Sequence, residues 1–114
     1  MSIKTQKIDS VILLALDGNI LGGPESTEIN QNLLKFIEEG YKKFIIDLSN
    51  VNIMNSSGLG TLIASLSTIK KNGGSLRIAG ANNKIQNLFN VTKLNTVFEL
   101  SETVDNALQF FKES

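Results

Sequence analysis

Several residue types that carry common protein chemistry are missing from this 114-residue sequence. It contains no cysteine and no histidine, and it has a single proline. Without cysteine no disulfide framework can form, and without histidine the commonest zinc ligand and general base are lacking. We therefore expect no metal, no cofactor and no enzymatic activity.

An excess of charge of either sign is also missing. Lysine plus arginine number 11 and aspartate plus glutamate number 11, which gives a formal net charge of zero. No block of basic residues is interleaved with the aromatic residues, so the sequence lacks the electrostatic footprint of a nucleic-acid-binding protein. We expect no direct contact with DNA or RNA.

Long hydrophobic runs are missing as well. The longest extends from Val11 to Leu16, far short of the roughly 20 residues that a membrane-spanning helix needs. Polar residues interrupt the start of the chain at Lys4, Thr5 and Gln6, which does not suit a signal peptide. We expect no membrane insertion and a cytoplasmic location.

What is present is an alternation of strand and helix patterns. The length and the 41% hydrophobic content suit one domain over residues 1–114. Strands are predicted at 3–8, 11–16, 44–48, 75–79 and 97–100. Helices are predicted from 24 to 39, from 55 to 71, around 85–89, and after a cap at Ser101. This order predicts an α/β fold with a mixed sheet of about five strands and about four helices. The first hairpin, turning at Asp9-Ser10, should be antiparallel and the other strands largely parallel.

The junction between the third strand and the second helix is the candidate functional site. Asn55, Ser56 and Ser57 occupy the predicted helix entrance, and Gly58 and Gly60 lie in its first turn. A helix entrance presents unpaired N–H groups and a partial positive charge, so it favours short polar side chains and can receive a phosphate. Glycine costs roughly 0.5–1 kcal/mol in a helix relative to alanine, so two of them indicate a close approach of another backbone or a ligand.

Other interpretations of this junction are possible. Serine and asparagine are ordinary helix caps, and glycine can simply ease close packing of a helix on a strand. Nucleotide binding is disfavoured because no lysine follows in the phosphate-loop arrangement and Ile63 stands where a third glycine would be required. A serine hydrolase would need an unusual lysine base for Ser57. Asp47, at the end of the strand, is interpreted as structural, bonding the backbone of the following turn.

The residues around this junction resemble a known signature. Asp47-Leu48-Ser49-Asn50-Val51 followed by Met54-Asn55-Ser56-Ser57-Gly58-Leu59-Gly60 is similar to the pattern "DLS.V..MDSSGLG" of the anti-sigma factor antagonists, in the bacterial STAS-domain family. The likeness extends over most of the chain and implies the STAS fold. In that family the second serine of the pair is phosphorylated by a partner anti-sigma factor that is also a serine kinase. The matching position is Ser57, with Ser56 as the second choice.

The resemblance implies a switch between partners. The dephosphorylated form would bind the anti-sigma factor and so release a sigma factor, phosphorylation of Ser57 would end that binding, and a phosphoserine phosphatase would restore it. Ser65, further along the helix, is expected on its polar side. The residues expected to bind the partner are Gly23, Asn55, Ser56, Ser57, Gly58, Gly60 and Thr61.

The sequence departs from the family pattern in two places. Asn55 replaces the usual aspartate, which removes a negative charge beside Ser57 while keeping the capping ability. In the loop 18–25, typical members resemble "GELD", whereas here Asn19 and Leu21 stand at the two acidic positions. The partner specificity is therefore expected to differ. The alternative function is a STAS-type module that binds a protein or a small ligand such as a nucleotide in another signalling complex, without regulation by phosphorylation.

Overall fold

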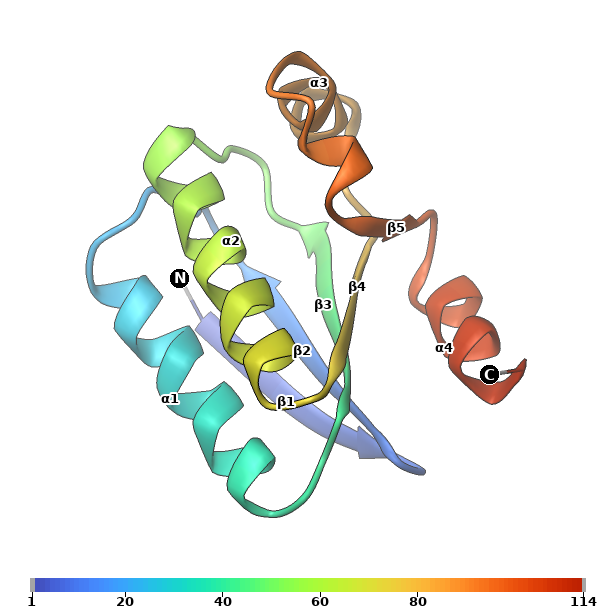
Figure 1. Cartoon of the computed structure of the whole chain (residues 1–114). Coiled ribbons are helices and arrows are strands. Elements are labelled where there is room, and N and C mark those ends of the chain that lie inside the picture. Colours follow the sequence, from blue (N-terminus) through green and yellow to red (C-terminus); the bar gives the residue numbers. More distant parts are fainter. Residues whose placement is uncertain (1, 114) are drawn as a thin grey trace.

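A five-stranded mixed sheet lies between helices on both of its faces (Figure 1). The computed structural model describes residues 2–113. The elements in chain order are β1 (Ser2–Ile8), β2 (Val11–Asp17), α1 (Pro24–Glu38), β3 (Lys43–Asn50), α2 (Ser56–Lys71), β4 (Ser75–Ala79), α3 (Asn83–Val91), a 3₁₀ helix (Leu94–Thr96), β5 (Glu99–Ser101) and α4 (Val104–Glu113). The strands lie in the spatial order β1-β2-β3-β4-β5. β1 and β2 are antiparallel and the remaining pairs are parallel, which confirms the predicted fold class.

The first hairpin turns where it was predicted to turn. Ile8 pairs with Val11 across the turn Asp9–Ser10, and Asp9 has a positive φ of 55°. Aspartate tolerates this left-handed conformation better than most residues because its short polar side chain can bond locally.

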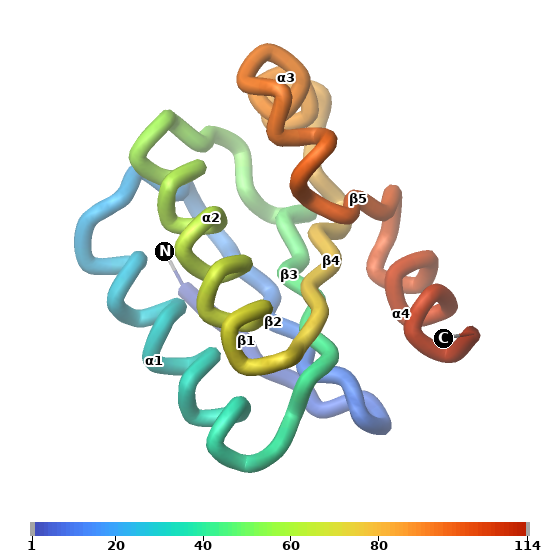
Figure 2. Tube along the Cα trace, in the orientation of Figure 1, coloured from blue at the N-terminus to red at the C-terminus, as the bar shows by residue number. Residues whose placement is uncertain are grey.

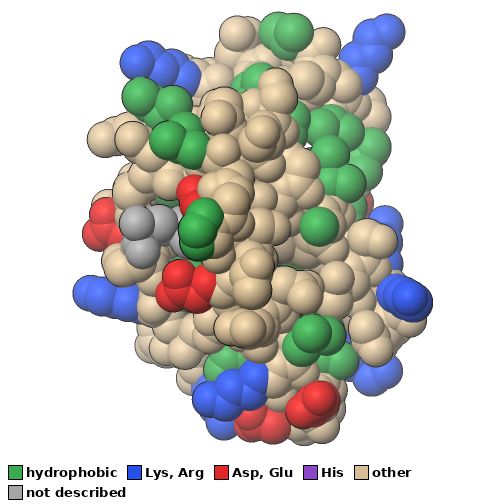
Figure 3. Space-filling view, turned by 90° about the vertical axis from the view of Figure 1, so that its left-hand side faces the viewer, with side chains coloured by type: hydrophobic (Ala, Val, Ile, Leu, Met, Phe, Trp, Pro, Cys, Tyr) green, Lys and Arg blue, Asp and Glu red, His purple; other side chains and the backbone are tan. Residues whose placement is uncertain are grey.

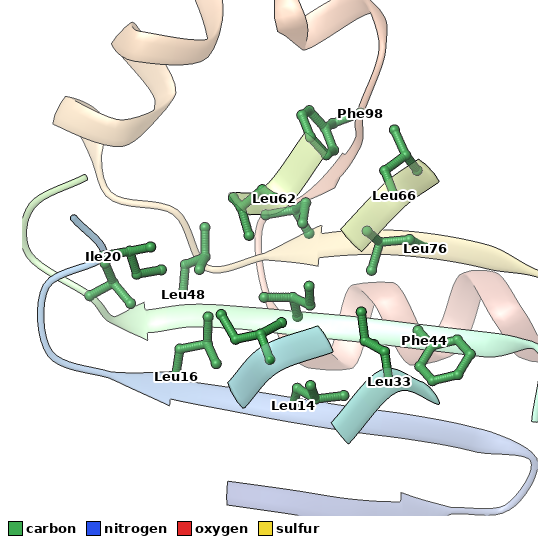
Figure 4. Packing of buried hydrophobic residues seen from close by; sticks show 14 of the residues in the cluster. Leu14, Leu16, Ile20, Leu33, Phe44, Leu48, Leu62, Leu66, Leu76 and Phe98 are labelled. Carbon is green, nitrogen blue, oxygen red and sulfur yellow. The ribbon is translucent and has the colours of Figure 1, made fainter. Parts of the chain in front are cut away.

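The sheet is buried on both faces at its centre. Phe44, Ile46 and Leu48 of β3 belong to the large core beneath α1 and α2, whereas Ile45 packs with Phe111 on the α4 side. Side chains alternate between the two faces of a strand, so a strand covered on both faces is a continuous apolar run. Figure 4 shows the large core, with Ile20 at one end of it near Leu48.

Helix α1 begins and ends as its glycines and proline predicted. Gly23 is the N-cap and Pro24 occupies the first turn, where a missing N–H costs nothing. At the other end Gly40, with φ 98°, donates its N–H to the carbonyl of Ile37 at 3.0 Å. The N–H of Tyr41 donates to Phe36 at 3.1 Å, which completes a Schellman motif.

The C-terminal part of the chain departs from the prediction at two points. The last strand is Glu99–Ser101, later than the predicted 97–100, and a 3₁₀ helix precedes it. The predicted cap at Ser101 is wrong, because Ser101 pairs with Ala79 in the sheet. Thr103 caps α4 instead: its Oγ1 accepts a hydrogen bond from the N–H of Asn106 at 3.1 Å. A strand this short gives little periodic signal, so neighbouring hydroxyl residues compete for the capping position.

Two loops meet at the end of the sheet where β2 and β3 finish. Residues 18–23 leave β2 and residues 51–55 leave β3, and an isolated parallel bridge between Ile20 and Met54 joins them. Figure 2 shows the two segments side by side at the start of α2. The carboxyl ends of parallel strands are the usual place for binding sites in open α/β sheets.

Candidate functional site

The entrance of α2 is built as the sequence predicted. Asn55 is the N-cap, and its Oδ1 accepts a hydrogen bond from the N–H of Gly58 at 2.8 Å. Its backbone carbonyl accepts the first helical bond, from Leu59, at 2.9 Å. The first turn contains no acidic residue. Asparagine therefore supplies the same capping geometry as aspartate here, without the charge.

Ser57 presents an exposed hydroxyl at this entrance. Both Ser56 and Ser57 are exposed, and no hydrogen bond of the Ser57 hydroxyl is seen within residues 2–113. The backbone of Ser57 is fixed in the helix, and its carbonyl accepts a hydrogen bond from Thr61 Oγ1 at 3.3 Å. The hydroxyl is thus accessible to a second macromolecule while its position is determined by the helix.

The β2–α1 loop packs directly against Ser57. Gly22 has φ +91°, and a Cβ built on it would lie 2.7 Å from the Cβ of Ser57. Ile20, which is fully buried, donates its N–H to Ile53 at 3.0 Å and accepts from Asn55 at 3.4 Å. Only glycine satisfies both the positive φ and the short distance at position 22. The exposed Gly23 follows as the α1 cap.

The two glycines in the first turn of α2 have different roles. Gly58 is buried, and a Cβ there would lie 2.0 Å from the carbonyl oxygen of Ile20. Its absent side chain is explained by packing within the chain, so the expectation that Gly58 lets a partner approach is corrected. Gly60 is exposed and a Cβ there would meet no atom within 4 Å. Gly60 remains available for partner contact, which stays a prediction.

Thr61 and Ser65 are buried beneath the exposed face of α2, between α2 and α1. Ser65 Oγ donates to the carbonyl of Thr61 at 3.0 Å, and Thr61 itself donates to Ser57. A hydroxyl that bonds the carbonyl four residues earlier is satisfied without water and can be buried. The expectation that Ser65 lies exposed on the polar side is therefore corrected, whereas partner contact at Thr61 stays a prediction. Both residues line a groove of about 520 Å³ whose walls include Asn30 and Thr68.

Glu25 anchors the β2–α1 loop, a role that the sequence did not predict. Its Oε1 accepts a hydrogen bond from the N–H of Leu21 at 3.1 Å. Hydrogen bonds from its own backbone N–H and from that of Leu21 hold the pKa of the Glu25 carboxyl below its usual value. The sequence signal that could have predicted this role is an acidic residue in the first turn of a helix, directly after the Gly-Pro pair that begins it.

Asn82 fixes the β3–α2 loop from outside, and this role was also missed. Its Nδ2 donates to the carbonyls of Val51 and Asn52, each at 3.1 Å, while its Oδ1 caps α3 at Ile85. Asp47 is structural, as predicted: its Oδ1 accepts hydrogen bonds from the N–H of Ser49, at 3.0 Å, and from the Ser49 hydroxyl.

The ion pairs seen within residues 2–113, Lys7–Glu39 and Arg77–Glu99, involve neither loop of the site. Among the described residues, no group of histidine, cysteine, aspartate or glutamate could hold a metal ion. None of the helices between residues 2 and 113 is long and apolar enough to cross a membrane. On the face seen in Figure 3, charged side chains of both signs lie mainly towards the edges and hydrophobic ones form separate patches.

Comparison with known proteins identifies the family to which the domain is similar. The model of the STAS domain matches residues 2–107. An anti-sigma-B factor antagonist of Bacillus subtilis is 25% identical over 109 residues, which cover 96% of each chain. One of Staphylococcus epidermidis is 31% identical over 75 residues, 66% of this chain and 69% of that protein. The match to a relative from Thermotoga maritima covers 66% of that relative's length.

Solved structures share the fold. An anti-sigma factor antagonist from Mycobacterium paratuberculosis has a TM-score of 0.80 at 23% identity, covering 95% of this chain and 91% of that one. The Bacillus cell fate determinant SpoIIAA in its phosphorylated form has a TM-score of 0.73 at 14% identity, covering 96% and 99%. At these identities the likeness shows the fold alone, which is the STAS fold that the signature implied. With the family model matched over nearly all of its residues, this chain belongs to the STAS domain family.

Proposed function

We propose that this chain is an anti-sigma factor antagonist controlled by phosphorylation of Ser57. In the unmodified form, the surface around Ser57 binds an anti-sigma factor that has serine-kinase activity, and a sigma factor is released. Phosphorylation of Ser57 by that kinase ends the complex, and a phosphoserine phosphatase restores it. The observation that carries the proposal is the exposed hydroxyl of Ser57, without a hydrogen bond in the described chain, at the first turn of α2. Curated relatives named as anti-sigma-B factor antagonists support it.

The charge of a phosphate explains how binding would be switched off. A phosphoserine carries about −1.5 to −2 charges at neutral pH. The N-terminus of α2 can stabilise this charge locally, so the domain should stay folded. A partner surface that fits the neutral serine would have to remove water from the charged group, which is costly without a matching cation. The modification should therefore act on the complex and leave the fold intact.

The exposure of Ser57 gives a phosphate room at this position. Gly22 packs against the Cβ of Ser57 on the side of the β2–α1 loop, whereas the residue as a whole is exposed. A phosphate on the Ser57 oxygen would then enter the space that a docked partner would fill. The location follows from the proposed partner: a regulator of sigma factors acts in the cytoplasm.

Mapping of the modified residue tests the proposal. Incubation with the anti-sigma factor kinase of the same genome and ATP should add one phosphate, detected by mass spectrometry. Ser57→Ala should abolish the modification, and Ser56→Ala should leave it. A wild-type chain that binds the anti-sigma factor without accepting phosphate would support the alternative of a binding module that is not regulated in this way.

The effect of charge on binding is tested by substitution at the same position. Ser57→Asp should weaken binding of the anti-sigma factor at least about ten-fold, because a carboxylate must then be desolvated in the interface. Ser57→Asn serves as the control, because asparagine is similar in size to aspartate but uncharged, and it should bind more tightly than Ser57→Asp. Both variants should melt within a few degrees of the wild type. Equal affinities for Asp, Asn and wild type would rule out the charge mechanism.

A further inference from the structure

We infer that Leu21 and Ile53 form an apolar docking pair beside Ser57, and that the surface of the anti-sigma factor that covers them is apolar and uncharged. This inference rests on the proposed function and deepens it by describing the chemistry of the partner. The two residues would determine which anti-sigma factor this chain accepts. They are called the Leu21–Ile53 pair below.

The bridge between the two loops determines where these side chains point. Ile20 and Met54 are bridge partners, and both are buried beneath the loops. Successive side chains of an extended segment point to opposite faces, so the neighbours of the bridge point outward. Leu21 is 48% exposed and Ile53 is 50% exposed. One buried pair thus places two large apolar side chains on the outer face of the same short bridge.

The pair is continuous with the candidate switch. Leu21 lies between Ile20, whose carbonyl contacts Gly58, and Gly22, which packs on Ser57. The carbonyl of Ile53 accepts the hydrogen bond from the Ile20 N–H. Because the pair lies on the two loop segments next to Ser57, we expect a partner that docks on this end of the sheet to cover both Ser57 and the Leu21–Ile53 pair.

The backbone of both residues is held before any partner arrives. The N–H of Leu21 donates to the Glu25 carboxylate at 3.1 Å. On the other loop, Asn82 donates hydrogen bonds to the carbonyls of Val51 and Asn52, the two residues that precede Ile53. An ordered apolar side chain loses little further freedom on binding, so more of its burial contributes to affinity. Single exposed apolar residues are common on protein surfaces, but two on one fixed bridge beside the candidate site are a local concentration.

The charge around the pair selects the kind of partner. Asn19, Asn55 and Ser56 are exposed and uncharged. Two charges of opposite sign flank the pair: the carboxylate of Glu25 in α1, which accepts the Leu21 N–H, and Lys84 of α3, which lines a hollow together with Ile53. Because these charges offset each other, no excess of one sign favours a charged partner surface, whereas an apolar surface would bury the two side chains favourably. Leu21 and Asn19 occupy positions where the resembling sequences carry acidic residues, so this chain should be a poor ligand for partners that read those acids.

Binding measurements with matched variants test the inference. The probe is the purified anti-sigma factor kinase of the same genome, titrated calorimetrically with wild type, Leu21→Asp and Ile53→Asp. Leu34→Asp is the control, because Leu34 is a 41% exposed apolar residue on α1, outside the two loops. We expect each loop variant to bind roughly ten-fold or more weakly and the control within about two-fold of wild type. Circular dichroism melting establishes that each variant is folded.

Measurements of salt dependence and of self-association could overturn the inference. Wild-type affinity should change little between about 50 and about 300 mM salt, because apolar contacts are not screened. A steep loss of affinity with salt, or loop variants that bind like the control, would overturn the inference while the proposed function stands. A wild-type dimer that Leu21→Asp dissociates would also overturn it, since the pair would then serve a second copy of this chain. Failure of wild type to bind the kinase would overturn the proposed function itself, and the inference with it.

Discussion

At the scale of single residues, the two glycines of the α2 entrance show how one residue type serves two purposes. Position 58 needs glycine because the carbonyl of Ile20 lies where a Cβ would be, whereas a Cβ at position 60 would point into open space. Sequence spacing alone could not separate them, because both stand in the same helical turn and both carry the same intrinsic cost. The difference depends on a loop that lies far away in the chain.

Substitution by alanine should separate the two glycines. Gly58→Ala should lower the free energy of unfolding by about 1–3 kcal/mol, because the new methyl group collides with the Ile20 carbonyl. Gly60→Ala should raise it by about 0.5–1 kcal/mol, since alanine favours the helix and meets no atom. Urea unfolding measures both. Changes of the same sign would contradict these assignments.

The sequence predicted the positions of some residues of the candidate site correctly and those of others incorrectly. Asn55 as the cap and Ser57 as an exposed neighbour followed from their places at a helix start, where the physical requirement is local. Ser65 was misplaced because a polar side chain usually indicates solvent. Its hydroxyl bonds one of the helix's own carbonyls, which hides the polarity and permits burial.

At the scale of the elements, the β2–α1 loop and the first turn of α1 form a unit held by Glu25. Its lowered pKa means that the folded state favours the carboxylate. The contribution to stability is therefore present above the unfolded pKa of about 4.5 and is lost as the pH falls through the lower folded value. Protonation should release the N–H of Leu21 and loosen the loop beside Ser57.

The pH behaviour of this loop can be measured directly. A carboxyl NMR titration should place the pKa of Glu25 below 4.5, and exchange of the Leu21 amide should accelerate as Glu25 is protonated, relative to amides elsewhere. Glu25→Gln should speed that exchange at neutral pH, and Glu28→Gln, in the same helix, should not. A Leu21 amide that is indifferent to Glu25→Gln would contradict the anchoring role.

Most elements followed from the sequence because their signals are local and strong. β3 is a continuous apolar run, and α1 lies between Pro24 and Gly40. The prediction failed where the element is short and depends on tertiary pairing: β5 is set by its register with β4, and that pairing draws Ser101 away from α4. Capping by Thr103 is visible only once the strand is placed.

At the scale of the whole molecule, the sheet separates two halves with different tasks. The core beneath α1 and α2 supports the loops of the candidate site, and a smaller cluster with Ala107 and Phe111 lies on the α4 side. Arg77 joins β4 to the far side: its Nε donates to Ser101 Oγ at 2.9 Å, and its guanidinium lies 3.9 Å from the ring centre of Phe110.

Variants on the α4 side should change stability without changing partner binding. Arg77→Met should reduce the free energy of unfolding by about 1–3 kcal/mol, because its hydrogen bonds and its stacking on Phe110 are lost. Its affinity for the anti-sigma factor, measured well below the melting temperature, should stay within about two-fold of wild type. Lys4→Met, on the exposed surface of β1, is a control for loss of a charge and should change neither stability nor affinity. A large loss of affinity in Arg77→Met would mean that the two halves are coupled through the sheet.

The contact of Gly22 with Ser57 also limits how this domain can diverge or be redesigned. A side chain at position 22 would face two penalties at once, from its own backbone angle and from the serine beside it. The loop after β2 and the entrance of α2 therefore form a single structural unit, although 34 residues lie between these two positions along the chain. Grafting the loop of another family member onto this scaffold should succeed only when both segments are exchanged together.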